Sequence, residues 1–200
     1  MQVVLATWNA HKVEEVTQIL KHAGAGVEVV GLEAFGGLPE APETGDTFTE
    51  NALQKAHFVF ERVGGPDRIV VADDSGLVVD ALDGAPGVHS KRFTPQATAE
   101  SNNRRLMAEL AEEDQRTARF VCVMAVVSAH GEQVAEGRCE GHIARSPQGD
   151  GGFGYDPLFA PEGWNGRTLA QATAAEKNAI SHRGRAFRQL PDVLAALGLS

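Results

Sequence analysis

Short apolar runs alternate with amphipathic segments in the first third of the chain, and this alternation limits the available folds more than any other feature. Residues 2–6, 27–30 and 69–72 read as short buried strands. Apolar side chains at helical spacing predict a helix over residues 11–23, and a second helix is predicted over 48–62. This order of strands and helices favours an α/β fold.

The middle of the chain adds a hairpin to this pattern. Residues 119–129 and 133–139 read as two strands joined around His130-Gly131, which is a hairpin signal. Further predictions are helices over 99–113, 174–190 and 191–197, an irregular stretch over 77–92 and a glycine-rich loop over 149–155. The 200 residues fit one domain, or one domain with two lobes. The whole pattern predicts an α/β fold with a mixed sheet.

The charge balance excludes two classes of partner. The 18 basic and 27 acidic residues give a net charge of −9, whereas duplex DNA and anionic membranes attract proteins rich in Lys and Arg. The longest nearly unbroken apolar run, 120–129, is far shorter than the roughly 18 residues that cross a bilayer, and no secretory signal is visible. Cys122 and Cys139 match neither a disulfide framework nor a zinc spacing. We therefore expect a cytoplasmic protein that binds neither nucleic acid nor membrane.

Polar residues gather first between the strand 2–6 and the helix that follows it. Thr7-Trp8-Asn9-Ala10-His11-Lys12 occupies this junction, and a helix N-terminus offers free backbone N–H groups to a phosphate. Lys12 opposes the preference of the helix dipole for acids there, which is easier to explain if an anion binds. The alternative is that Asn9 is only a helix cap and Lys12 a solvated lysine.

A second polar group precedes the helix over 48–62. Thr47 and Glu50 have the spacing of a capping box, so Glu50 has a structural explanation, whereas Glu43 lies in the preceding loop, where capping does not account for it. Lys55 lies five residues beyond Glu50 and does not share its helix face closely. Whether Glu50 binds a metal or is structural stays open from the residues alone.

A third polar group, Asp73-Asp74-Ser75-Gly76, is expected to end the strand over 69–72. Two adjacent carboxylates at the end of a buried strand repel each other and are costly to desolvate, unless a cation or hydrogen-bond donors compensate. Mg²⁺, which prefers oxygen ligands, would do so. The alternatives are a turn with exposed acids and a structural role for Asp73.

A cluster of basic residues lies near the C-terminus. Between residues 167 and 188 the chain holds Arg167, Lys177, His182, Arg183, Arg185 and Arg188, and Glu176 is the only acid. Such a segment can hold a polyphosphate. Together with the acids and Lys12 it indicates nucleotide phosphate chemistry, although neither a P-loop nor a dinucleotide-binding fingerprint is present.

Four blocks of the sequence resemble the HAM1/RdgB-type inosine triphosphate pyrophosphatases, also called non-standard purine nucleoside triphosphate pyrophosphatases. They occur in the family's order and extend from residue 5 to about residue 187. The blocks are LATWNAHKVEE (5–15), ETGDTFTENA (43–52), ADDSGL (72–77) with GAPGV (84–88), and GGFGYDP (151–157) with EKN (176–178) and SHR (181–183).

The resemblance implies a fold and an activity. The fold would be an elongated mixed β-sheet flanked by helices, with two lobes and a central nucleotide cleft. The activity would be hydrolysis of the α–β phosphoanhydride bond of inosine, deoxyinosine and xanthosine triphosphates (ITP, dITP and XTP). The products would be the monophosphate and pyrophosphate. The resemblance also implies Mg²⁺ as cofactor and a cytoplasmic homodimer.

Residue roles follow from the resemblance. Asp74 would be the proton acceptor and a metal ligand, Glu43 the second metal ligand, and Lys12 would stabilise charge as the bond breaks. The phosphate side would comprise Thr7, Trp8, Asn9, Ala10, His11, Lys12, Lys55 and Ser75. The base and ribose side would comprise Phe153, Gly154, Tyr155, Asp156, Lys177, His182 and Arg183. Trp8 and His11 stand where many members have smaller residues, so the individual roles of these two are left open.

Two alternatives compete with this interpretation. One is a nucleotide pyrophosphatase of the Maf type, although its N-terminal Ser-x-Ser-x-Arg-Arg pattern is absent. The other is a nucleotide-binding regulator without catalysis, which would be expected to lack acids, yet Glu43, Asp73 and Asp74 are all present.

Overall fold

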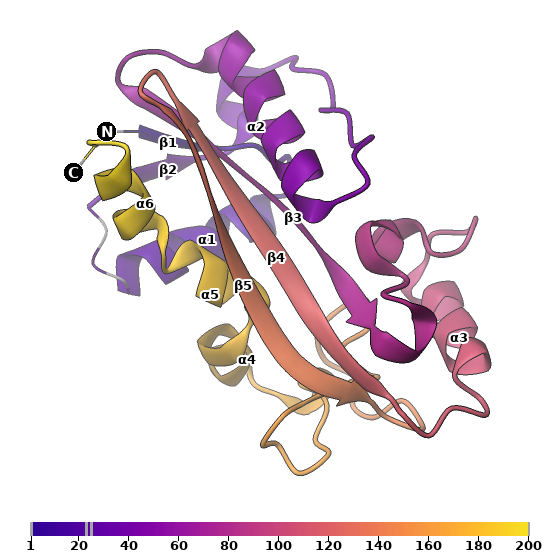
Figure 1. Cartoon of the computed structure of the whole chain (residues 1–200). Coiled ribbons are helices and arrows are strands. Elements are labelled where there is room, and N and C mark those ends of the chain that lie inside the picture. Colours follow the sequence, from indigo (N-terminus) through magenta and orange to yellow (C-terminus); the bar gives the residue numbers. More distant parts are fainter. Residues whose placement is uncertain (1, 23, 25, 200) are drawn as a thin grey trace. The chain divides into compact units, whose positions relative to one another are not determined.

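A mixed six-stranded sheet organises the part of the chain that the computed structural model describes, residues 2–22, 24 and 26–199 (Figure 1). The strand order is β2-β1-β3-β4-β5-β6. β1 pairs in parallel with both β2 and β3, whereas β5 and β6 are antiparallel. The strands are β1 (Gln2–Leu5), β2 (Glu28–Val30), β3 (Arg68–Val79), β4 (Thr117–Ser128), β5 (Gly131–Ile143) and β6 (Phe159–Pro161). The α/β class and the mixed sheet are confirmed.

Two helices connect the parallel strands, as the opening pattern predicts. The helix α1 (Ala10–His22) buries Val16, Ile19 and Leu20, and the predicted last residue of this helix, Ala23, lies outside the described residues. The helix α2 (Phe48–Val63) matches its prediction within one residue at its end. Parallel strands need such crossovers because a tight turn cannot join them.

The strand β3 is longer than the sequence predicts, and this corrects the placement of the acidic pair. The predicted end at residue 72 is wrong, because the strand continues through Asp73 and Asp74 to Val79. Side chains alternate between the two faces of a strand, so the adjacent carboxylates point to opposite faces and are not forced together. The mutual repulsion that the sequence predicted is therefore reduced.

The chain divides into two compact units. One comprises the residues up to Asp74, Cys122–Gly137 and the residues from Arg183, and the other comprises Ser75–Val121 and Arg138–His182. Each unit has its own apolar cluster, which includes Val3, Leu5 and Phe187 in the first and Leu77, Leu106 and Phe159 in the second. The expectation of two lobes around a nucleotide cleft stays a prediction.

Several of the remaining helices are shorter than predicted, whereas the hairpin strands β4 and β5 are longer. The helix α3 (Ala99–Glu109) ends four residues early, and the irregular stretch contains the end of β3 and two 3₁₀ helices, Asp80–Leu82 and Gly87–Arg92. The C-terminal segment forms α4 (Ala174–Ile180), α5 (His182–Phe187) and α6 (Leu190–Ala196). Within the described ranges, no helix combines the length and apolar character needed to cross a membrane.

Candidate active site

Asn9 builds the turn between β1 and α1. Its side-chain oxygen accepts hydrogen bonds from the backbone N–H groups of His11 at 3.1 Å and Lys12 at 3.3 Å, which is the arrangement of a helix N-cap. Its own N–H donates to the Thr7 hydroxyl at 3.2 Å. The capping role expected of Asn9 is confirmed. Trp8, Ala10 and His11 are exposed around this turn, where a ligand can reach them.

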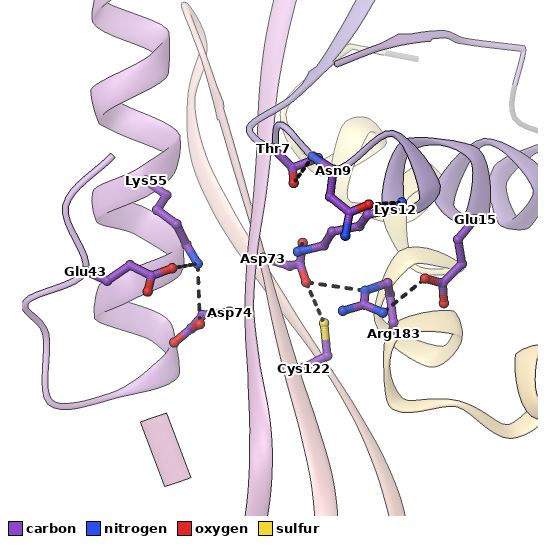
Figure 2. Close-up of polar contacts among 10 residues, drawn as sticks. All are labelled: Thr7, Asn9, Lys12, Glu15, Glu43, Lys55, Asp73, Asp74, Cys122 and Arg183. Atoms are coloured by element: carbon purple, nitrogen blue, oxygen red, sulfur yellow. Dashed lines mark hydrogen bonds and ion pairs between the residues drawn. The ribbon is translucent and has the colours of Figure 1, made fainter. Parts of the chain in front are cut away.

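Lys12 is not a solvated lysine, because its Nζ lies 2.5 Å from Oδ1 of Asp73. Figure 2 shows a series of ion pairs of alternating charge that starts with Lys12 and Asp73. The second Asp73 oxygen lies 3.5 Å from Nε of Arg183 and accepts from the Cys122 thiol at 3.7 Å. The Arg183 guanidinium in turn donates to Glu15 at 3.1 Å. Two cations and two anions thus cancel one another in this cluster.

The pairing of Asp73 outweighs the cost of its burial. Burial by itself raises the pKa of the Asp73 carboxyl, but Lys12 and Arg183 hold that pKa well below its usual range. Burial likewise lowers the pKa of Arg183, and Asp73 and Glu15 raise it above its usual value. Asp73 therefore stays ionised, and the compensation that the sequence predicted comes from protein cations.

Asp74 lies on the other face of β3, toward α2 (Figure 2). Its Oδ1 is 3.3 Å from Nζ of Lys55, and its Oδ2 accepts from the Asn51 amide at 3.1 Å. Lys55 also reaches Oε1 of Glu43 at 2.8 Å. One ammonium group therefore holds two carboxylates that come from different elements.

The electrostatics of this second group differ from those around Asp73. Burial raises the pKa of Asp74, and Glu43 adds to the rise, although Lys55 and Asn51 counteract both. Burial lowers the pKa of Lys55, but Asp74 and Glu43 outweigh it and raise that pKa overall. A carboxylate whose pKa lies above its usual value is a better proton acceptor.

The capping box of α2 is confirmed and fixes the loop that carries Glu43. The Glu50 carboxylate accepts from the N–H groups of Asp46 and Thr47, and the Glu50 N–H donates to the Thr47 hydroxyl at 3.1 Å. The Asn51 side-chain oxygen accepts from Gly45 N–H at 2.8 Å. Glu50 is therefore engaged in structure.

Glu43 and Asp74 are the donors best placed for a cation. Among the described residues, no group of three or more His, Cys, Asp or Glu side chains gathers as a metal site. Mg²⁺ is commonly held by one or two carboxylates together with substrate phosphates and water. A pair of carboxylates already drawn to one ammonium cation fits that coordination chemistry.

The second unit contains the predicted base-side residues other than Arg183. Two of them, Phe153 and Lys177, contact the Asp156 carboxylate. Its Oδ2 accepts from the Phe153 N–H at 2.7 Å and from Nζ of Lys177 at 2.5 Å. The same Nζ lies 4.1 Å from the centre of the Phe153 ring. Phe153 is 67% exposed. A Cβ on Gly152, which has φ +72°, would come within 2.1 Å of Asp156 Oδ2, so glycine is required there.

Not every predicted contact residue faces outward. Asp156 and Tyr155 are buried, and the Tyr155 hydroxyl donates to the Ser90 carbonyl at 2.8 Å. His182 stacks on Phe120, with ring centres 4.9 Å apart, while Ser75 and Gly154 are half-buried. Asp156 and Tyr155 thus support the loop around Phe153 from inside.

The basic C-terminal segment is not a single positive patch. Arg167 pairs with Glu176 at 3.0 Å, Lys177 with Asp156, and Arg183 with Asp73. The sequence predicted a positive segment, whereas acids neutralise these three residues.

Sequence reasoning did not assign roles to Asn51 and Glu15. Asn51 precedes Lys55 by four residues on a helix and hence shares its face, a signal that was available. Glu15 and Arg183 are 168 residues apart, and no local pattern connects them.

Comparisons with known proteins identify the family and support the fold. The model of the Ham1 family matches residues 3–193. The dITP/XTP pyrophosphatase of Streptomyces coelicolor is 46% identical over 200 residues and covers 98% of each chain. That of Nocardia farcinica is 50% identical over 201 residues, covering 98% of this chain and 96% of the relative. The solved structure of a HAM1 protein from Coxiella burnetii has a TM-score of 0.86 at 37% identity, and the match covers 98% of this chain and 99% of that one.

The fold and these matches thus define a mixed α/β hydrolase. The chain belongs to the Ham1 family.

Proposed function

We propose that the chain is a dITP/XTP pyrophosphatase, which hydrolyses dITP, XTP and ITP to the monophosphate and pyrophosphate. The relatives that match over nearly the full length are named for dITP and XTP. The observation that carries the proposal is Asp74, which lies beside Lys55 and Glu43 on one face of β3.

Asp74 is the proposed proton acceptor. A water molecule attacks phosphorus at the α–β anhydride, its proton passes to the Asp74 carboxylate, and the P–O bond to the leaving pyrophosphate breaks. The raised pKa of Asp74, caused mainly by burial, suits this task. Asn51 orients the carboxylate through its second oxygen.

Lys12 and Lys55 are the proposed cations for the phosphates. Lys12 lies at the N-terminus of α1, where backbone N–H groups also favour an anion, and Asp73 holds its side chain. Glu43 and Asp74 would hold Mg²⁺, which when bound offsets the charge of the phosphates. Thr7, Trp8, Asn9, Ala10, His11 and Ser75 complete the proposed phosphate side.

The base and ribose side is proposed to comprise Phe153, Gly154, Lys177, His182 and Arg183, with Phe153 stacked on the purine. A donor aimed at the purine 6-oxo group would meet the amino group of adenine, and an unpaired buried polar group of this kind gives strong selectivity. Asp156 and Tyr155 are proposed to support the loop that carries Phe153 and not to contact the substrate. A cytoplasmic homodimer remains part of the proposal.

The decisive experiment measures pyrophosphate release from ITP, dITP, XTP, ATP and methylated pyrimidine triphosphates, with Mg²⁺ and with EDTA. We expect rapid release from the first three only, and none with EDTA. A preference for methylated pyrimidine nucleotides would favour the Maf-type alternative. Tight binding without turnover at saturating Mg²⁺ would favour the regulator.

The first prediction concerns Asp74→Asn, which should abolish turnover in a folded protein because amide nitrogen and oxygen cannot take the proton. Glu50→Gln is the matched control, since glutamine also closes a capping box, and it should retain the wild-type rate. Near-wild-type turnover of Asp74→Asn would show that Asp74 is not the proton acceptor.

A further inference from the structure

Asn103 on α3 holds the backbone of the Phe153 loop. Its side-chain Nδ2 donates to the Gly154 carbonyl at 3.0 Å. Its Oδ1 is buried, and no donor among the described residues reaches it. Buried polar atoms in proteins are nearly always paired, so an unpaired oxygen calls for an explanation. Rotating the amide would place Oδ1 against the Gly154 carbonyl, which fixes the observed orientation.

The preceding residue of α3 supports the next residue of the loop. Asn102 donates to the Ser90 carbonyl at 3.3 Å, and the Tyr155 hydroxyl donates to the same carbonyl at 2.8 Å. Consecutive residues of one helix therefore hold consecutive residues of one loop, Asn103 directly and Asn102 through Ser90. The Thr98–Ser101 capping box fixes the start of this helix.

Phe153 lies between two such anchors. On its N-terminal side the Phe153 N–H donates to Asp156, and on its C-terminal side the Gly154 carbonyl accepts from Asn103. Gly154 has φ +60°, so this peptide unit has more conformational freedom than its neighbours. The Asn103 hydrogen bond restrains the chain at that point, while the Phe153 ring stays exposed.

We propose that Asn103 is a positioning residue for base recognition, which presents the Phe153 ring to the purine by holding the Gly154 carbonyl. The inference rests on the proposed function, in which Phe153 stacks on the base. Asn103 itself touches no substrate. Its unpaired oxygen is tolerated because the donor half of the amide fixes the loop.

The test compares steady-state constants for dITP in N103A, N103D, F153A and the double variant N103A/F153A. N103D keeps the side-chain volume but replaces the donor with a carboxylate. We expect both Asn103 variants to raise KM by about three- to tenfold, the scale of one hydrogen bond, with kcat within about twofold of wild type. The exposed neighbour R104A is the matched control and should leave both constants unchanged.

The double variant separates positioning from general structural damage. If Asn103 acts through Phe153, N103A should add nothing to the KM of F153A. Additive effects, or an unchanged KM in N103A and N103D, would overturn the role of Asn103 while leaving the proposed function intact. An unchanged KM in F153A would instead remove the base-stacking role and the inference with it.

Hydrogen exchange supplies an independent readout. The Phe153 and Gly154 amides should exchange faster in N103A than in wild type, while the amides of α3 stay protected. Equal protection of the loop in the two proteins would contradict the proposal. If N103A does not fold, N103D provides both measurements.

Discussion

Asp73 and Asp74 show how two identical side chains acquire different properties one residue apart. Asp73 is almost fully buried among Lys12, Arg183 and the Cys122 thiol, and its charge is compensated on several sides. Asp74 shares one ammonium with Glu43, and burial dominates its pKa. The first arrangement favours a permanent anion, and the second favours a group that can accept a proton.

The two aspartates should therefore respond differently to the same substitution. Asp73→Asn leaves Lys12 and Arg183 facing a neutral group, and we expect a loss of roughly 3 kcal/mol in the free energy of unfolding, as when one partner of a buried ion pair is removed. Asp74→Asn should change that free energy by less than about 1 kcal/mol, because burial disfavours the Asp74 charge more than its contacts with Lys55 and Asn51 favour it. Urea unfolding of both variants checks this, and equal losses would contradict it.

At the residue scale, the sequence predicted which side chains are important better than it predicted which residues they contact. The Asn9 cap and the Thr47–Glu50 box were predictable because their hydrogen bonds are local. A cation that compensates the charge of Asp73 was expected, but the sequence did not indicate that Arg183 supplies it. The pairing depends on how the sheet brings residues 73 and 183 together, which no short-range pattern encodes.

At the scale of elements, helix starts were more predictable than strand ends. The helices α1 and α2 follow apolar periodicity and capping signals, which act within a few residues. The end of β3 was misplaced because acidic residues usually interrupt buried strands. The cations on α1 and α2 that permit them here become visible only in three dimensions.

The helix α4 offers a pH-dependent prediction. Hydrogen bonds from Arg167 and from the Thr173 backbone lower the pKa of Glu176 from 4.5 to about 2. Because the folded value lies below the unfolded one, the stabilisation is fully present above about pH 4.5 and is lost as the pH falls through about 2. NMR titration of the Glu176 carboxyl should give a midpoint near 2.

Glu176→Gln is the control for this titration, since glutamine can also close the capping box with Thr173. The stability of this variant should depend less on pH than that of the wild type between about pH 4.5 and 2. Parallel stability curves for the two proteins would show that the ionised carboxylate contributes nothing.

At the scale of the whole molecule, three strands run from one compact unit into the other. β3 crosses at Asp74, β4 at Cys122 and β5 at Gly137. The α/β class was predictable from the order of elements alone. Two lobes were expected from the family resemblance, but the residues that divide them were not, because the division falls within long strands whose lengths the sequence understates. Shared strands favour cooperative unfolding of both units.

The two cysteines report on that cooperativity, since Cys122 belongs to the first unit and Cys139 to the second. Both are buried, so neither should react with a thiol reagent in the native protein. We expect both to become reactive at the same urea concentration, with mass spectrometry assigning the label to each residue. Labelling of one thiol well before the other would show that the units unfold separately.

The alternation of side chains along β3 has a consequence for how the gene can vary. Deleting or inserting one codon between those for Arg68 and Ala72 would shift the register by one position and exchange the faces of the two aspartates. After a deletion, Asp74 would lie at the position that Asp73 now occupies, and Ser75 would lie beside Lys55 and Glu43 in place of the proton acceptor. A change of two codons would keep each aspartate on its face but move it two positions along the strand, away from its cations. The length of this part of β3 is therefore expected to vary little.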